Sequence, residues 1–186
     1  RTHQGFILLT LGFFVCGFQL GFITIHLPPY VKDLGLNAEV AAIGLALIGG
    51  FNIVGSLVSG YVGQRWSKKK SLSFIYLLRG LLIVGLMLLP KTEITLYVFT
   101  ASMGLLWLST VPLTSGIIAQ VFGLRYMATL FGIVFLSHQL GSFLGIWLGG
   151  MLYDTTGSYE LVWWLGAALG IGAALAGLRP IYVHQR

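Results

Sequence analysis

Long apolar runs separated by short polar connectors dominate the chain. A helix that spans a membrane needs about 20 mostly apolar residues, and the runs are interrupted at glycine, proline and charged positions. They predict six spans, at about residues 5–30, 38–63, 71–89, 94–121, 127–153 and 159–178. The runs do not alternate between apolar and polar residues, as the strands of a membrane barrel do. The spans are therefore predicted to be helices.

Charged residues lie mostly between the spans, and residues 64–70 hold four cations and no acid. Short basic loops of this kind are retained on the cytoplasmic side of a membrane during insertion. Threading the spans from this loop places eight of the eleven cations inside and two outside, with Arg79 within the third span. All five acids fall outside. The pattern predicts six helices with both chain ends cytoplasmic.

Composition agrees with a membrane protein, because 56% of the residues are hydrophobic and only 9% are charged, against about 25% charged in soluble proteins. Insertion explains the net charge of +6, so nucleic acid is not predicted as a partner. The single cysteine, Cys16, excludes a disulfide within the chain and is interpreted as a small core residue. No metal and no cofactor are predicted. Residues 1–4 lead directly into a span without a start Met, which favours a segment of a longer chain.

The basic connector carries a recognisable motif, since residues 60–69 read Gly-Tyr-Val-Gly-Gln-Arg-Trp-Ser-Lys-Lys. It resembles the loop signature of the major facilitator superfamily, in which Gly and three residues precede Asp, Arg, any residue, Gly, Arg and a basic residue. Gln64 replaces the acid, Ser67 the second Gly and Lys68 the Arg, as in the weaker copy of the C-terminal half. A plain positive-inside loop explains the lysines but not the offset of Gly60. The motif residues are Gly60, Gly63, Gln64, Arg65, Lys68 and Lys69.

The resemblance covers the chain and implies helices seven to twelve of a twelve-helix transporter in the inner (plasma) membrane of a bacterium. The implied partners are the lipid bilayer, a small-molecule substrate and the N-terminal six-helix half. Residues 26–35 and 150–159 are similar to the monocarboxylate-porter-like branch. Related porters often carry Arg where Ser56 follows Asn52-Ile-Val-Gly55. A carboxylate and a neutral or zwitterionic solute therefore both stay open.

Polar side chains at membrane depth are costly, which makes them the default candidates for a transport path. The candidates are Gln19, His26, Asn52, Ser56, Trp107, Thr110, Thr114, His138 and Gln139. His138 with Gln139 is the main pair, because it lies roughly 18 Å into the fifth span. An imidazole could bind an anion or carry a proton near neutral pH, and a buried histidine bonded to a neighbouring helix is an equal alternative. His26 is expected near the outer mouth, as a guard or as a satisfied interfacial side chain.

Four residues are predicted to have structural roles. Arg79 lies too deep for easy snorkelling and needs a partner, which is a backbone carbonyl, a substrate or a group in the other half. Pro112 is expected to interrupt the fourth span, either as an ordinary kink or by freeing the groups of residues 108–110 toward a ligand. Asp154 is expected to accept hydrogen bonds from the start of the sixth span, and Gly157 to permit a tight reversal.

The leading interpretation is secondary active transport of a small organic solute, such as a carboxylate, by alternating access with proton symport or exchange. The chain is not predicted to be an enzyme. One alternative is a six-helix intramembrane hydrolase that uses Ser115 and His138, although Leu113 stands where serine proteases of this kind need Gly. The other is a channel subunit that oligomerises through the glycine faces of the second and fifth spans. Inverted three-helix repeats are expected within a transporter half.

Overall fold

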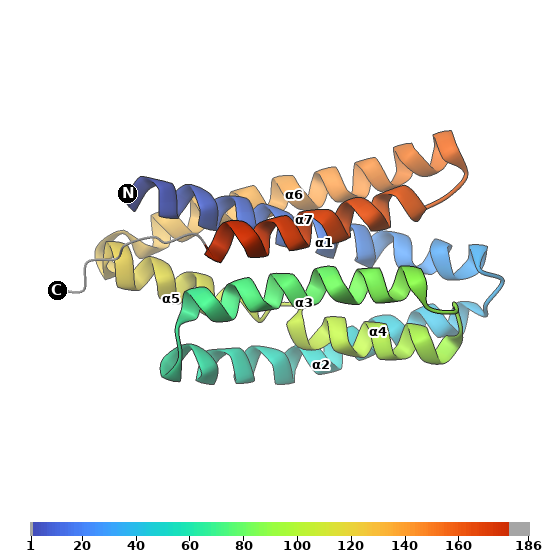
Figure 1. Cartoon of the computed structure of the whole chain (residues 1–186), viewed down its shortest axis with the longest axis horizontal. Helices are drawn as coiled ribbons and strands as arrows, with labels where there is room; N and C mark the ends of the chain where they lie inside the picture. The colour runs from blue at the N-terminus through green and yellow to red at the C-terminus, as the bar shows by residue number, and fades with distance from the viewer. Residues whose placement is uncertain (1, 179–186) are drawn as a thin grey trace.

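The structure, a computed structural model, describes residues 2–178, with side chains from residue 4 onward. All regular elements within these residues are helices, which run along one elongated bundle (Figure 1). They are α1 (Thr2–Asp33), α2 (Ala38–Arg65), α3 (Lys68–Leu88), α4 (Glu93–Leu106), α5 (Thr110–Phe122), the short 3-10 helix η1 (Leu124–Tyr126), α6 (Met127–Thr156) and α7 (Glu160–Leu178).

The described residues form six segments long and apolar enough to cross a membrane, because α4 and α5 together make one crossing. The all-helical membrane fold predicted from the sequence is confirmed. The helices extend further into the connectors than apolar length alone suggests, since α1 reaches Asp33 and α6 reaches Thr156. The fourth span is interrupted near Pro112, as expected, and consists of two helices with residues 107–109 between them.

The helices alternate in direction along the bundle (Figure 1). The start of α1, the α2–α3 and α5–α6 connections and the end of α7 lie at one end of the molecule. We call this the basic end, because Arg65, Lys68, Lys69, Lys70 and Arg125 lie there. The other three connections lie at the opposite end. This arrangement matches six crossings that begin and finish on the side of the basic connector.

The turn between α6 and α7 differs in part from expectation. α6 continues through Asp154 to Thr156 and is capped by Gly157, whose φ of 69° is a left-handed conformation that glycine adopts without strain. The exposed Asp154 carboxylate is therefore part of α6 and does not cap α7. The hydroxyl oxygen of Ser158 accepts the bond from the Glu160 amide instead, at 3.1 Å.

Three helix pairs make the most extensive contacts, namely α1 with α6, α2 with α4, and α3 with α7. The first three membrane segments, α1, α2 and α3, correspond in order to the last three, α4–α5, α6 and α7. Under this correspondence the α1–α6 pair is equivalent to the α2–α4 pair, and the α3–α7 pair joins the last helices of the two units. The first helix of one three-helix unit runs opposite to the first of the other (Figure 1). The bundle therefore consists of two inverted three-helix units.

Glycines allow two of these helix pairs to approach closely. A Cβ on Gly141 or Gly145 of α6 would collide with backbone carbonyls of α1, at Phe14 and Phe18. A Cβ on Gly55 of α2 would collide with the Leu105 carbonyl of α4 in the same way. Small residues at such contacts are typical of membrane helix pairs. Gly55, Gly141 and Gly145 are thus used for contacts between helices of this chain.

Two apolar cores fill the bundle, one toward each end. Trp163 is fully buried in the core away from the basic end and meets the ring of Phe22 edge-on, with centroids 4.8 Å apart. Phe13 and Ile118 belong to the core near the basic end. The Trp107 side chain packs against both cores. The interruption between α4 and α5 therefore lies at the middle of the bundle, where the two cores meet.

Candidate functional site

The interruption of the fourth span, residues 107–109, is the natural centre of a candidate site, and we call it the break. α4 ends at Leu106 and α5 begins at Thr110, so Pro112 is the third residue of α5. A proline is tolerated in the first turn of a helix but clashes with the carbonyl four residues earlier in a continuous one. That carbonyl belongs to Leu108, so the proline lies in the first turn of α5, just after the break.

Side chains of α2 satisfy one side of the break. The Leu108 amide donates to Oδ1 of Asn52 at 3.0 Å, and the hydroxyl of Ser56 donates to the same oxygen at 3.3 Å. Asn52 therefore supplies an acceptor to an amide that a continuous helix would have paired. Two of the predicted candidates thus hold the break by hydrogen bonds of their own chain.

Arg79 of α3 provides hydrogen-bond donors on the other side of the break. Its Nη2 donates to the carbonyl of Trp107, the residue that caps the C-terminus of α4, where a cation also opposes the negative end of the helix dipole. Its Nη1 donates to Sγ of Cys16 at 3.1 Å. The guanidinium is fully buried, and no carboxylate of residues 4–178 forms an ion pair with it. Among the three partners expected for Arg79, the structure shows the backbone carbonyl.

Cys16 and Thr110 extend this arrangement toward α6. The two side chains are fully buried, with Sγ and Oγ1 3.5 Å apart, and the His138 ring neighbours the thiol. We call Cys16, Arg79, the Trp107 carbonyl, Thr110 and His138 the central polar cluster. Sequence reasoning missed Cys16 because a cysteine in an apolar run looks like an ordinary core residue. The sequence signal that could have identified Cys16 is that Arg79 needs a hydrogen-bond acceptor at its own depth in the membrane.

His138 lies at the edge of this cluster. Its Nδ1 is 3.2 Å from Oε1 of Gln139, and its ring stacks on Phe135 with centroids 5.6 Å apart and packs against Phe13 at 5.2 Å. The imidazole is 8% exposed, whereas Gln139 and Phe135 are exposed on α6. His138 therefore connects the buried cluster with a surface of the bundle, which is the position that a proton-carrying or ligand-binding side chain needs.

The remaining candidates lie apart from the break. Gln19 donates to the Gly166 carbonyl of α7 at 2.8 Å. His26 has Nε2 2.9 Å from the Ile146 carbonyl and Nδ1 3.4 Å from the Tyr159 hydroxyl. Burial, together with the nearby Asp33, raises the pKa of Tyr159 above its ordinary value, so that hydroxyl stays protonated at neutral pH. The Thr114 hydroxyl is buried without a hydrogen-bond partner among the described residues.

The motif at the basic end is largely helical, although a loop was expected. Only Trp66 and Ser67 separate α2 from α3, so Gln64 and Arg65 belong to the last turn of α2, and Lys68 and Lys69 to the first turn of α3. The Ser67 hydroxyl caps α3 by accepting from the Lys70 amide at 3.4 Å. Ser67, at the position of the second signature glycine, therefore acts as a helix cap.

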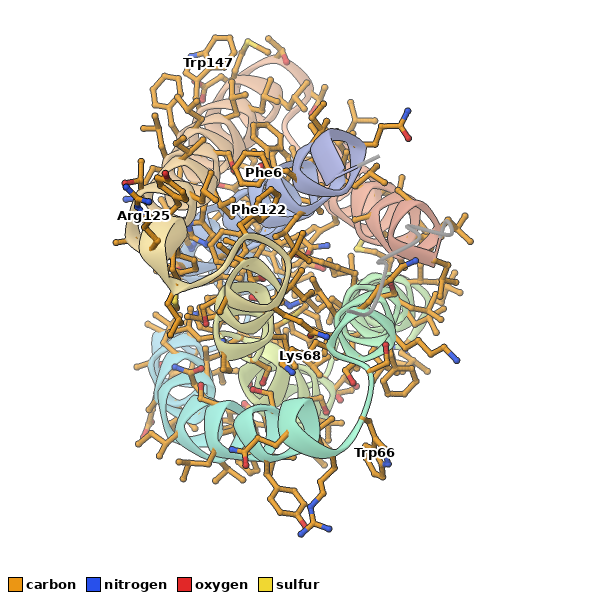
Figure 2. All side chains as sticks on the ribbon, turned by 90° about the vertical axis from the view of Figure 1, so that its left-hand side faces the viewer. Phe6, Trp66, Lys68, Phe122, Arg125 and Trp147 are labelled. Atoms are coloured by element: carbon orange, nitrogen blue, oxygen red, sulfur yellow. The ribbon has the colours of Figure 1, made fainter. Side chains whose placement is uncertain are left out.

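The glycines of this motif differ in their surroundings. A Cβ on Gly63 would lie 2.8 Å from Cδ2 of Leu113 in α5, whereas a Cβ on Gly60 would meet no atom within 4 Å. Lys68 points inward (Figure 2), and its Cε lies 2.9 Å from the Cβ position of Gly116. The close packing around the motif thus involves Gly63 and Lys68, while Gly60 faces open space in this bundle.

Six apolar crossings, short connectors and a broken helix with a buried polar cluster at mid-bundle define an integral, multi-pass membrane protein. The family model described as Major Facilitator Superfamily matches residues 9–186, and the chain belongs to that superfamily. The resemblance seen in the basic motif is confirmed.

Similar proteins come from bacteria and vertebrates. An uncharacterized MFS-type transporter, YcxA of Bacillus subtilis (strain 168), is 30% identical over 83% of this chain and 39% of its own length. Monocarboxylate transporter 12-B of Danio rerio is 28% identical over 81% of the chain and 32% of its own length. Monocarboxylate transporter 12 of Xenopus laevis is 29% identical over 95% of this chain and 39% of its own length. The chain spans about two fifths or less of the length of these relatives.

The catalytic alternative finds no support in the geometry. The Ser115 hydroxyl donates to the Pro112 carbonyl of its own helix at 3.2 Å, and His138 bonds to Gln139. No hydrogen bond joins the two side chains in the described structure, although a nucleophile and its base need one. The relatives are named as transporters and not as hydrolases.

Proposed function

We propose that this chain is the C-terminal six-helix half of a secondary active transporter that moves a small organic solute by alternating access. The observation that carries the proposal is the break in α4–α5 at mid-bundle, held by Asn52 and Arg79. Interrupted helices near the midplane form the solute sites of many transporters. The N-terminal half of the same protein would complete the site, and the inner (plasma) membrane of a bacterium is the proposed location.

A small organic anion is the proposed substrate class. The names of the monocarboxylate transporters among the relatives support it. Arg79 is not the group that binds the carboxylate, because it is fully buried and both Nη atoms already donate to protein acceptors. With Ser56 at the position where related porters carry a cation, the protonated ring of His138 is the available positive group at this depth. Gln139 would donate a second hydrogen bond from its amide.

Proton symport through His138 is the proposed coupling, with substrate exchange as the alternative. All five acids lie near helix ends or in connectors, so none can carry a proton at mid-bundle. The His138 ring is bonded to Gln139 and borders the surface. A proton taken up there would place a positive charge beside the bound anion, which couples the two binding events electrostatically.

Uptake of labelled carboxylic acids into proteoliposomes that contain the complete protein tests this proposal. An imposed inward proton gradient should stimulate uptake of an organic anion by the wild type. His138→Gln should lose that stimulation by at least about tenfold, a loss of about 1.4 kcal/mol or more in coupling. Leu136→Ala, on an exposed position of the same helix, should retain it. Equal stimulation of both variants would exclude His138 as the proton carrier, and counterflow without stimulation would favour exchange.

A further inference from the structure

A cavity of about 470 Å³ lies near the basic end between α2 and α3. Its floor is formed by the ends of α4 and α5 that flank the break, and we call it the α2–α3 groove. Val58, Val62, Phe74, Ile75, Leu106 and Leu113 supply most of its wall. The groove does not include any side chain of the central polar cluster, although Ser109 of the break lines it.

The deep part of the groove offers no free hydrogen-bond donor. The Ser59 hydroxyl donates to the Ser56 carbonyl at 3.0 Å, and the Ser109 hydroxyl donates to the Leu105 carbonyl at 2.6 Å. A polar solute would lose its hydrogen bonds to water here without gaining others. The groove therefore fits an apolar ligand.

The dimensions fit one hydrocarbon chain of a lipid. Lining residues on α2 extend from Gly55 to Val62, with Trp66 just beyond the helix, a length of about 17 Å at 1.5 Å per residue. One leaflet of the hydrocarbon core is about half of 30 Å thick. The volume of 470 Å³ holds roughly fifteen groups of about 30 Å³ each, the space of one water molecule in the liquid. The groove thus runs from the membrane surface to the middle of the bundle.

The mouth of the groove is basic. Lys70 lines it directly, and Arg65, Lys68 and Lys69 lie at the same end, with no acid in this connector. Trp66 is 71% exposed and points away from the bundle at the α2–α3 connection (Figure 2), which is typical of aromatic residues at the membrane interface. Clusters of cations at a membrane surface attract anionic lipid headgroups.

We infer that the α2–α3 groove binds one anionic phospholipid, with an acyl chain in the groove and the headgroup phosphate at Lys70. A bilayer lipid gains little from moving an acyl chain between two apolar surroundings, so the headgroup charge supplies the selectivity. The end of the acyl chain reaches Leu105 and Ser109, on the two sides of the break. The bound lipid therefore packs against the same interruption that Asn52 and Arg79 hold from the interior.

Native mass spectrometry of the complete protein, released from vesicles of equal phosphatidylglycerol and phosphatidylcholine, tests this inference. The wild type should retain one phosphatidylglycerol per chain. Lys70→Gln, at an exposed position, should lower the preference for the anionic lipid about fivefold. Ser59→Phe, which fills the groove, should abolish retention of either lipid. Leu57→Phe is the matched control, because residue 57 is 72% exposed on the same helix, and it should retain the lipid.

Three results would overturn the inference. The first is equal retention of the two lipids by the wild type, and the second is unchanged retention by Ser59→Phe. The third uses a photo-crosslinking amino acid at position 74, in the wall of the groove. Attachment to another segment of the protein instead of a phospholipid would show that the other half of the transporter occupies the groove. Because Lys70→Gln changes no buried contact, its effect on headgroup preference stays informative even if Ser59→Phe fails to fold.

Discussion

At the scale of single residues, Arg79 is the side chain whose environment most needs explanation. A buried cation without a carboxylate partner is costly in a membrane protein, yet Arg79 bonds to Trp107 and Cys16 in a fully buried position. Arg79→Met should lower the free energy of unfolding by about 1–3 kcal/mol, because the Trp107 carbonyl loses its donor. Thermal unfolding of the complete protein in detergent measures this.

Two further variants make that measurement specific. Arg79→Lys keeps the charge but not the planar group that reaches two acceptors at once, so it should recover only part of the loss. Arg125→Met removes a cation from an exposed site beside Tyr126 and should leave the unfolding midpoint nearly unchanged. An Arg79→Met protein as stable as Arg125→Met would show that the guanidinium does not hold the break.

At the scale of the elements, the break depends more on contacts from α2 and α3 than on its proline. Pro112 lies in the first turn of α5, where its missing amide proton costs no hydrogen bond. Pro112 is half-buried, and Pro112→Ala removes no hydrogen bond, so it should change the free energy of unfolding by less than about 1 kcal/mol. Asn52→Ala should cost more, about 1–3 kcal/mol, because the Leu108 amide loses its acceptor. Denaturant titrations that reverse this order would contradict the assignment.

The packing of α6 on α1 gives a matched pair of variants on one helix. A Cβ on Gly141 would collide with the Phe14 carbonyl, whereas a Cβ on Gly132 meets nothing within 4 Å. Gly141→Ala should destabilise the protein by about 1–3 kcal/mol through overpacking. Gly132→Ala should be neutral or stabilise it by up to about 1 kcal/mol, because alanine favours the helix. Equal unfolding midpoints for the two variants would argue that α1 and α6 lie further apart in the membrane.

The sequence predicted the spans well because apolar length and charge are local properties, and a membrane imposes both on each helix separately. It predicted an interruption of the fourth span near Pro112, but not the contacts that hold Trp107, Leu108 and Ser109 outside both helices. Their conformation depends on Asn52, 56 residues away, and on Arg79. Asp154 was assigned to a cap for a related reason, because the length of α6 beyond its apolar run is not visible in the sequence. Ser158 takes that role.

At the scale of the whole molecule, the residues that hold the two inverted three-helix units together differ from those proposed to meet the solute. Gly55 of α2 packs closely on α4, and Gly141 and Gly145 of α6 pack closely on α1. The Leu108 amide and the Trp107 carbonyl are paired inside the bundle, whereas the buried His138 is bonded to Gln139, which is exposed on the bundle surface. A solute would therefore meet Gln139 and His138 first, and the break would respond through the packing of α5 against α6.

Gly60 is the motif residue whose role must lie outside this bundle. No atom approaches its Cβ position within 4 Å, so glycine is not required there for packing among the described helices. If a helix of the other half packs on Gly60 in one state of the cycle, Gly60→Leu should block that state. Uptake by the complete protein should then fall by about tenfold or more, about 1.4 kcal/mol, while expression and the unfolding midpoint stay close to wild type.

Gly172→Leu on α7 is the matched control for this prediction, because its Cβ position is equally open and α7 packs mainly on α3. It should leave uptake unchanged. If the Gly60→Leu protein transports normally, the basic connector only orients the helices in the membrane, a role for which the cations of the connector suffice. Loss of uptake in Gly60→Leu without loss of stability would instead place a contact with the other half at Gly60, whose Cβ position meets no atom of residues 4–178 within 4 Å.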